Sequence, residues 1–157
     1  MAGGGPLMDL GIYCLQGICY TSGMEPIAVT AQSSPISDPE KFIDIEETLT
    51  WQMEMPGGLI AECKTSYTDG MNHLKVEAER GSFELQPSFS YSGIKGKTPG
   101  GIIEYQPLSQ QAKQMDDDAL SIIQDKPMQV PGEEGLKDIR IVRAIYQSAA
   151  TGKRVDI

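Results

Sequence analysis

Asp9 and Tyr13 are the residues whose types and spacing suggest proton chemistry. They stand four residues apart in an apolar stretch predicted to be helical over 6–19, so their side chains lie one turn apart on one face, with Gln16 beside them. A phenol exchanges a proton with a hydroxyl or carbonyl oxygen when nearby positive charge favours its ionised form. Asp9 opposes that ionisation, so this role would need a cation from elsewhere. The more common alternative is a core tyrosine whose hydroxyl is bonded to Asp9.

Other residues that could carry chemistry have simpler explanations. His73 has no neighbouring catalytic partner and is predicted to lie half exposed on a strand. Consecutive aspartates at 116–118 point about 100° apart on a helix, which predicts a solvated face and no metal site. The glycines at 3–5 lack the G-x-G-x-x-G spacing and the lysine of a phosphate loop. We therefore expect no metal ion and no cofactor site in these residues.

Composition narrows the partners and the compartment. The chain has 157 residues and a net charge of -9, which disfavours nucleic acid and anionic membranes as partners. No apolar stretch approaches the roughly 20 residues of a membrane-spanning helix.

Cys14, Cys19 and Cys63 show no metal-ligand spacing, and the first two are predicted to be small core residues. Their odd number favours a reducing, cytoplasmic location. A glycine run directly before a helix suggests the interior of a longer protein.

Changes in hydrophobic period predict the elements that position these residues. Apolar and polar residues alternate in two hairpins, one turning at Pro56-Gly57-Gly58 and one at Arg80-Gly81. Residues 87–107 are predicted to be short edge strands and loops. The expected strands are 26–33, 46–55, 59–67, 73–79, 82–86 and 155–157, and the expected helices are 6–19, 110–124 and 133–151.

This order of elements predicts an α+β fold. We expect a single domain over 1–157, with a mainly antiparallel, open-faced sheet whose helices pack on one face. The uncovered face is then a candidate interface. Because Trp51, Tyr67 and several methionines fall within the sheet segments, that face is expected to be partly apolar and to favour self-association into a homo-oligomer.

Three stretches resemble one enzyme family. GGGPLMDLGIYCLQGICY, residues 3–20, looks like the opening signature of the C-terminal domain of the Gfo/Idh/MocA oxidoreductases. PGEEGLKDIRIVRAIYQSAATGKRVDI, residues 131–157, is similar to the closing helix and tail of that domain, and SYTDGMNHLKVEAERGSFELQP, residues 66–87, resembles its glycine-turn hairpin. The resemblance covers essentially the whole chain.

The resemblance reverses the preference for a core Tyr13. Enzymes of this family combine an N-terminal Rossmann domain for NAD or NADP with a C-terminal domain that contacts substrate and assembles oligomers through its open sheet. Their helix carries a D-x-x-x-H acid/base pattern, with tyrosine in the glucose-fructose oxidoreductase branch, which Asp9 and Tyr13 match. By that likeness Tyr13 exchanges the substrate proton, Asp9 orients the substrate or the proton network, and Gln16 contacts substrate. An E-K-P lysine in the Rossmann half would supply the missing cation.

Two hypotheses about function remain. The first is the substrate-binding and oligomerisation domain of an NAD(P)-dependent oxidoreductase acting on a sugar, polyol or related hydroxy compound. Because G-x-G-x-x-G and E-K-P are absent, this chain is expected to bind no cofactor and to be inactive alone. The second is a non-catalytic module whose open sheet pairs with itself or with another protein.

Overall fold

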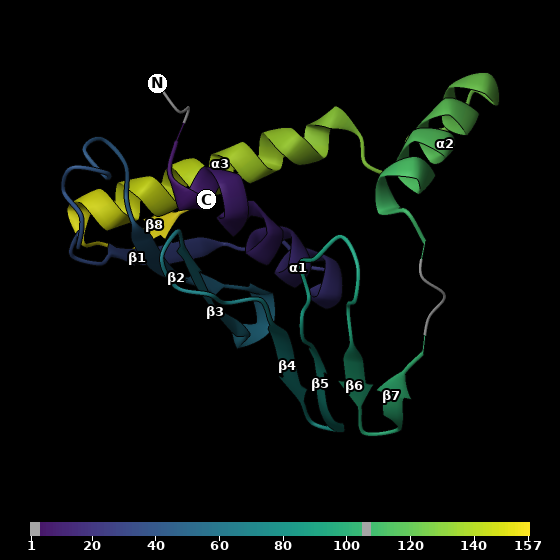
Figure 1. Cartoon of the computed structure of the whole chain (residues 1–157), viewed down its shortest axis with the longest axis horizontal. Coiled ribbons are helices and arrows are strands. Elements are labelled where there is room, and N and C mark those ends of the chain that lie inside the picture. Colours follow the sequence, from purple (N-terminus) through teal and green to yellow (C-terminus); the bar gives the residue numbers. More distant parts are fainter. Residues whose placement is uncertain (1–3, 105–107) are drawn as a thin grey trace. The chain divides into compact units, whose positions relative to one another are not determined.

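A computed structural model describes residues 4–104 and 108–157, and the contacts within it divide the chain between two units (Figure 1). Unit 1 contains the residues up to Met71 together with Gly135–Ile157, and unit 2 contains Asn72–Glu134. The first glycine of the run at 3–5 and residues 105–107 of the predicted edge region lie outside the described residues. That residues 1–157 act as one substrate-binding and oligomerisation domain stays a prediction.

Unit 1 is built on an antiparallel sheet with the strand order β3-β2-β1-β8. The predicted hairpin on either side of Pro56 is confirmed as β2 and β3, and Trp51 pairs with Ala31 on one side and Cys63 on the other. The predicted C-terminal strand is present, and it pairs with β1. The strands are β1 (Ala28–Ser33), β2 (Thr48–Glu54), β3 (Ile60–Ser66) and β8 (Val155–Asp156).

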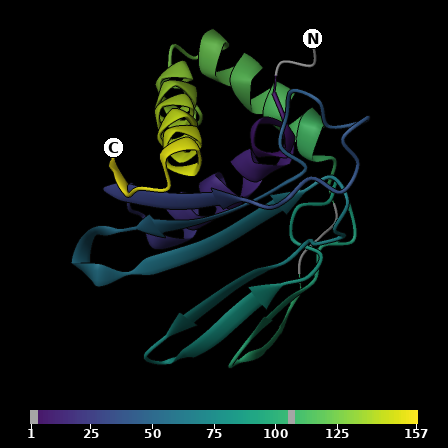
Figure 2. The ribbon, with the colours of Figure 1, turned by 90° about the vertical axis from the view of Figure 1, so that its left-hand side faces the viewer.

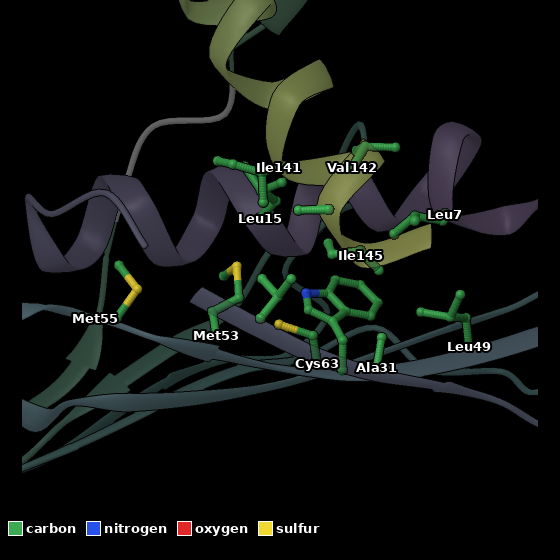
Figure 3. Close-up of a cluster of buried hydrophobic side chains, with 13 residues drawn as sticks. Leu7, Leu15, Ala31, Leu49, Met53, Met55, Cys63, Ile141, Val142 and Ile145 are labelled. Atoms are coloured by element: carbon green, nitrogen blue, oxygen red, sulfur yellow. The ribbon is translucent and has the colours of Figure 1, made fainter. Parts of the chain in front are cut away.

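Two helical segments cover one face of this sheet (Figure 2). The first begins as a π-helical turn, η1 (Leu7–Gly11), and continues as α1 (Ile12–Ser22), while the second is α3 (Gly132–Thr151). The labelled side chains in Figure 3 lie between the sheet and these helices. The buried hydrophobic cluster comprises Leu7, Leu15, Val29, Ala31, Leu49, Trp51, Met53, Met55, Cys63, Ile141, Val142, Ala144 and Ile145.

The apolar character predicted for the uncovered face of the sheet is wrong. Trp51 is only 2% exposed and Met53 is fully buried, because both side chains point toward the helices. Side chains alternate along a strand, so Thr50 and Gln52 occupy the other face and are exposed. The uncovered face of this sheet is therefore largely polar.

The first helix buries fewer of its apolar residues than its apolar sequence suggests. Leu7, Gly11 and Leu15 are buried at a four-residue interval, whereas Leu10 is 42% exposed. Cys14 and Cys19, predicted to be core residues, are only half-buried. The reason is that the helix presents a narrow stripe to the sheet and leaves the residues beside it near the surface.

Unit 2 holds a second antiparallel sheet, with the order β4-β5-β6-β7 (Figure 1). The predicted hairpin around Arg80-Gly81 is present, and the edge region contributes two short strands. The fold is thus α+β, as predicted, but with two sheets in place of one. The strands are β4 (Leu74–Ala78), β5 (Gly81–Leu85), β6 (Gly96–Thr98) and β7 (Gly101–Ile103).

The helix of unit 2, α2 (Gln110–Ile123), is well capped but has no buried residue. The Ser109 hydroxyl accepts a hydrogen bond from the Ala112 amide at 3.4 Å. The apolar side chains that predicted this helix remain at the surface, with Met115 66% and Ile123 78% exposed. None of the described helices has the length and apolar character needed to cross a membrane.

Candidate functional site

Asp9 and Tyr13 lie at the surface of the first helix of unit 1. Asp9 belongs to the π-helical turn and Tyr13 to the start of α1. Tyr13 is 48% exposed, so the interpretation of this residue as a core aromatic is wrong. Single π-helical turns at the end of or within α-helices occur frequently at functional sites. The helix thus offers an accessible phenol and a carboxylate about one turn apart.

Tyr67 joins this pair from the end of β3. Its hydroxyl donates a hydrogen bond to Asp9 Oδ2 at 3.1 Å. Partial burial, followed by the bond to Asp9, raises the pKa of Tyr67, so its phenol keeps its proton and serves as a donor. One oxygen of the Asp9 carboxylate is thereby held by the protein, while the residue as a whole remains exposed.

An aromatic contact fixes the ring of Tyr67. Phe42, which is 2% exposed, stacks on it with ring centroids 6.4 Å apart and planes 17° apart. The Tyr67 amide also donates to the Glu47 carbonyl at 3.1 Å. The sequence places Tyr67 in a strand segment but gives no sign that it reaches Asp9, which lies 58 residues earlier.

Gln16 is directed toward α3. Its Nε2 donates to Asp138 Oδ1 at 2.5 Å. The structure therefore brings Asp9 and Tyr13 to one exposed surface, where Tyr67 lies beside Asp9. The side-chain amide of Gln16 is hydrogen-bonded to α3 instead. The proposed roles of Asp9, Tyr13 and Gln16 toward a substrate stay predictions.

Close packing holds the site helix on the sheet. Thr65, a buried residue of β3, donates from its hydroxyl to the Pro6 carbonyl at 3.0 Å. Gly11 permits the close approach, because a Cβ at this position would lie 2.8 Å from Leu7 Cδ1 and 3.2 Å from Trp51 Cη2. The segment from Pro6 to Gly11 is thus positioned by the strands beneath it.

A pocket of about 340 Å³ opens beside the start of this helix. Apolar side chains such as Met8 and Val142 form part of its wall, together with the polar groups of Glu46, Arg143 and Tyr146. The backbone at 4–5 completes the wall, so the described part of the glycine run borders a hollow.

The remaining candidates have structural explanations. Burial raises the pKa of both Cys14 and Cys63, so these thiols stay protonated and are poor nucleophiles. His73 is exposed and lies directly before β4, so the prediction of a half-exposed strand residue is wrong. Asp117 pairs with Lys113 at 2.6 Å along α2. Among residues 4–104 and 108–157, no group of three or more His, Cys, Asp or Glu side chains could hold a metal ion.

Comparison with known proteins identifies the family to which this fold belongs. The sequence profile of the GFO/IDH/MocA C-terminal domain matches residues 1–84. The chain therefore belongs to the GFO/IDH/MocA family, of which it is a C-terminal domain.

Individual relatives agree with this family. The crystal structure of aldose-aldose oxidoreductase from Caulobacter crescentus is 35% identical, with a TM-score of 0.93, and the match covers 99% of this chain and 48% of that one. D-xylose 1-dehydrogenase [NADP(+)] of Haloarcula marismortui is 25% identical over 99% of this chain and 44% of its own length. Myo-inositol 2-dehydrogenase from Lactobacillus plantarum, 23% identical with a TM-score of 0.77 over 100% of this chain and 50% of that one, shares the fold. The chain spans about half the length of these relatives.

Proposed function

We propose that this chain is the substrate-binding and oligomerisation domain of an NAD(P)-dependent oxidoreductase that acts on a sugar, polyol or related hydroxy compound. The observation that carries the proposal is the exposed Tyr13 phenol near the Asp9 carboxylate, which Tyr67 holds by a 3.1 Å hydrogen bond. The similarity to aldose-aldose oxidoreductase and D-xylose 1-dehydrogenase supports a sugar or polyol as substrate. The assignment to the glucose-fructose oxidoreductase branch is part of this proposal.

In this proposal the two residues share the handling of a substrate hydroxyl. Tyr13 takes the proton of the hydroxyl that is oxidised, or returns it to the carbonyl oxygen in the reverse direction. Asp9 accepts a hydrogen bond from a substrate hydroxyl and so orients the sugar beside the phenol. Since Tyr67 donates to one oxygen of Asp9, that carboxylate presents its remaining acceptor positions in a defined direction.

The dinucleotide site belongs to another part of the enzyme in this proposal. The sequence contains no G-x-G-x-x-G, the glycine-rich motif that cradles a dinucleotide pyrophosphate. We therefore place NAD or NADP, and a cation that favours ionisation of Tyr13, in the part of the enzyme that this chain does not span. The chain alone is accordingly proposed to be inactive.

The decisive test uses the full-length enzyme with a panel of aldoses and inositols and either NAD⁺ or NADP⁺. Tyr13→Phe is expected to lower kcat by about 10²-fold or more, as loss of a general acid/base does. Tyr20→Phe is the matched control, because Tyr20 belongs to the same helix and is 87% exposed. Equal turnover by the Tyr13→Phe and wild-type enzymes would contradict the proposed role of Tyr13 in proton transfer.

The oligomerisation part of the proposal concerns the polar face of the unit 1 sheet. Thr30, Thr50 and Gln52 are exposed there on neighbouring strands and can hydrogen-bond across a pair of sheets. A second copy of the chain is the proposed partner, since interfaces often contain polar contacts. Light scattering should show an oligomer that Gln52→Arg weakens. A monomer at high concentration would contradict this part and leave the catalytic part intact.

A further inference from the structure

Glu46, which comes two residues before β2, connects three separate parts of unit 1. Its Oε1 accepts a hydrogen bond from the Leu7 amide at 3.1 Å and another from the Tyr146 hydroxyl at 2.9 Å. Leu7 begins the π-helical turn and Tyr146 belongs to α3, and the two lie 39 and 100 residues away from Glu46. A single carboxylate oxygen thus joins the site helix to the closing helix.

The backbone around Glu46 is shaped to receive this carboxylate. Gly5 is buried, and a Cβ at this position would lie only 2.3 Å from Glu46 Oε2. Any side chain there would displace the carboxylate from its place against the chain. The second oxygen of Glu46 is therefore also closely packed, and Glu46 is half-buried as a result.

The hydrogen bond from Leu7 to Glu46 satisfies an amide at the start of the helix. The first amides of a helix have no partner within it, and a negative group is favoured at this end. Pro6 has no amide hydrogen to offer, so Leu7 supplies the first available donor. With Thr65 holding the Pro6 carbonyl at 3.0 Å, the carbonyl and the amide of the single Pro6–Leu7 peptide group are each bound by a side chain.

Tyr146, the second residue that donates a hydrogen bond to Glu46, keeps its proton. Burial, followed by the hydrogen bond to Glu46, raises the pKa of Tyr146, so its phenol remains protonated. The charged side chains of Asp44 and Arg143 line the pocket beside Glu46. Arg143 is exposed. The two hydrogen bonds that Glu46 Oε1 accepts come from the Leu7 amide and the Tyr146 hydroxyl, and not from these charged side chains.

We propose that Glu46 is a positioning residue, which orients the turn that carries Asp9 and so aligns Asp9 and Tyr13 with the substrate without touching the substrate. Asp9 is two residues beyond Leu7, so a displacement of the Leu7 peptide shifts the Asp9 backbone directly. This inference deepens the proposed function and rests on it for its catalytic consequence. Small misplacements of catalytic groups are costly, since about 1 Å can lower a rate by about 10²-fold.

The first experiment measures the structural part in the 157-residue chain by NMR. Glu46→Ala should increase the rate of Leu7 amide exchange by about tenfold and shift the Asp9 resonances, because a hydrogen bond to a charged acceptor is lost. Glu46→Gln should restore most of the protection, since an amide oxygen accepts both bonds. If Glu46→Ala does not fold, Tyr146→Phe, which removes one of the two donors, should produce a smaller shift at Asp9.

The second experiment measures kcat and KM of the same variants in the full-length enzyme. Glu46→Ala should lower kcat by about 10- to 100-fold with little change in KM, and Glu46→Gln should recover much of the loss. Glu47→Gln is the matched control, because the neighbouring Glu47 is buried and its carboxylate is bound by Ser37 and Thr68 instead of the site helix. It should lower stability and leave kcat within about twofold of wild type.

The outcomes separate this inference from the proposed function. Unchanged Leu7 exchange and Asp9 resonances in Glu46→Ala, or an equal loss of kcat in Glu47→Gln, would overturn the positioning role. If Tyr13→Phe retains full turnover while Glu46→Ala still moves the Asp9 resonances, the proposed function fails and the structural role of Glu46 stands. Loss of kcat in Tyr13→Phe and Glu46→Ala, with rescue by Glu46→Gln, supports both.

Discussion

The two units of this chain contain sheets of similar design but very different interiors. Each has four antiparallel strands. Every buried apolar side chain of the described residues belongs to unit 1, whereas the apolar residues of β4 and β5 in unit 2 are at most half-buried. Two helices cover the sheet of unit 1, while α2 of unit 2 buries no residue. Strand pairing alone therefore does not create a packed core, and the candidate site lies on the unit that has one.

The largest expected effect compares one apolar side chain from each unit. Ile145→Ala removes a fully buried side chain of unit 1 and should lower the free energy of unfolding by about 2–5 kcal/mol. Phe83→Ala removes a half-buried ring of unit 2 and should cost about 1 kcal/mol. Urea unfolding followed by circular dichroism and by the fluorescence of Trp51, the single tryptophan, measures both. Equal losses would contradict the contrast between the units.

Much of the fold could be predicted from sequence because its signals are local. The alternation on either side of Pro56 identifies β2 and β3, and the helical period identifies α2 and α3. Alternation defines two faces of a strand but does not say which face the helices cover. For this reason the position of Trp51 at a covered face could not be inferred, and the exposed face was predicted to be too apolar.

The candidate site was only partly accessible to the same reasoning. The spacing of Asp9 and Tyr13 is a local property of one helix, so their common surface could be predicted. Tyr67 meets Asp9 across 58 residues, and Glu46 meets Leu7 across 39. Such partners leave no periodic signal, because each hydrogen bond depends on how the strands and helices pack. A carboxylate two residues before a strand offers no sign of its partner in the sequence.

An intermediate effect tests the close packing beneath the site helix. Gly11→Ala should lower the free energy of unfolding by about 1–3 kcal/mol, because the added Cβ would press on Leu7 and Trp51. Gly135→Ala is the opposite case: this exposed glycine lies in α3 with open space around it, so alanine should stabilise the helix by about 0.5–1 kcal/mol. Thermal unfolding measures both signs. A gain from Gly11→Ala would show that the helix is not tightly held.

The smallest expected effect concerns acid stability. Hydrogen bonds from the Ser37 hydroxyl, then from its amide and from Thr68, lower the pKa of Glu47 below its usual range. Since the folded pKa is the lower one, the stability from Glu47 is present above the unfolded pKa and is lost as pH falls through the folded value. Glu47→Gln should therefore flatten the decline in urea midpoint between about pH 6 and pH 3.

The matched variant for this measurement lies in unit 2. Lys75 lowers the pKa of Glu77 through a hydrogen bond and charge attraction, with a separation of 2.7 Å, but both side chains are exposed. Glu77→Gln should alter the acid decline less than Glu47→Gln does, because water and salt screen an exposed pair. A larger change from Glu77→Gln would reverse the expected order of the two units.

The hydrogen bond between Glu46 and Tyr146 bears on the order in which the parts of this chain fold. The turn that carries Asp9 precedes Tyr146 by more than a hundred residues, so on a ribosome the start of the site helix emerges long before the donor that completes its attachment. Contacts between residues so distant along the chain close late, since the loop entropy must first be overcome. The candidate site is therefore expected to acquire its final geometry only when α3 docks, after β1, β2 and β3 have already paired.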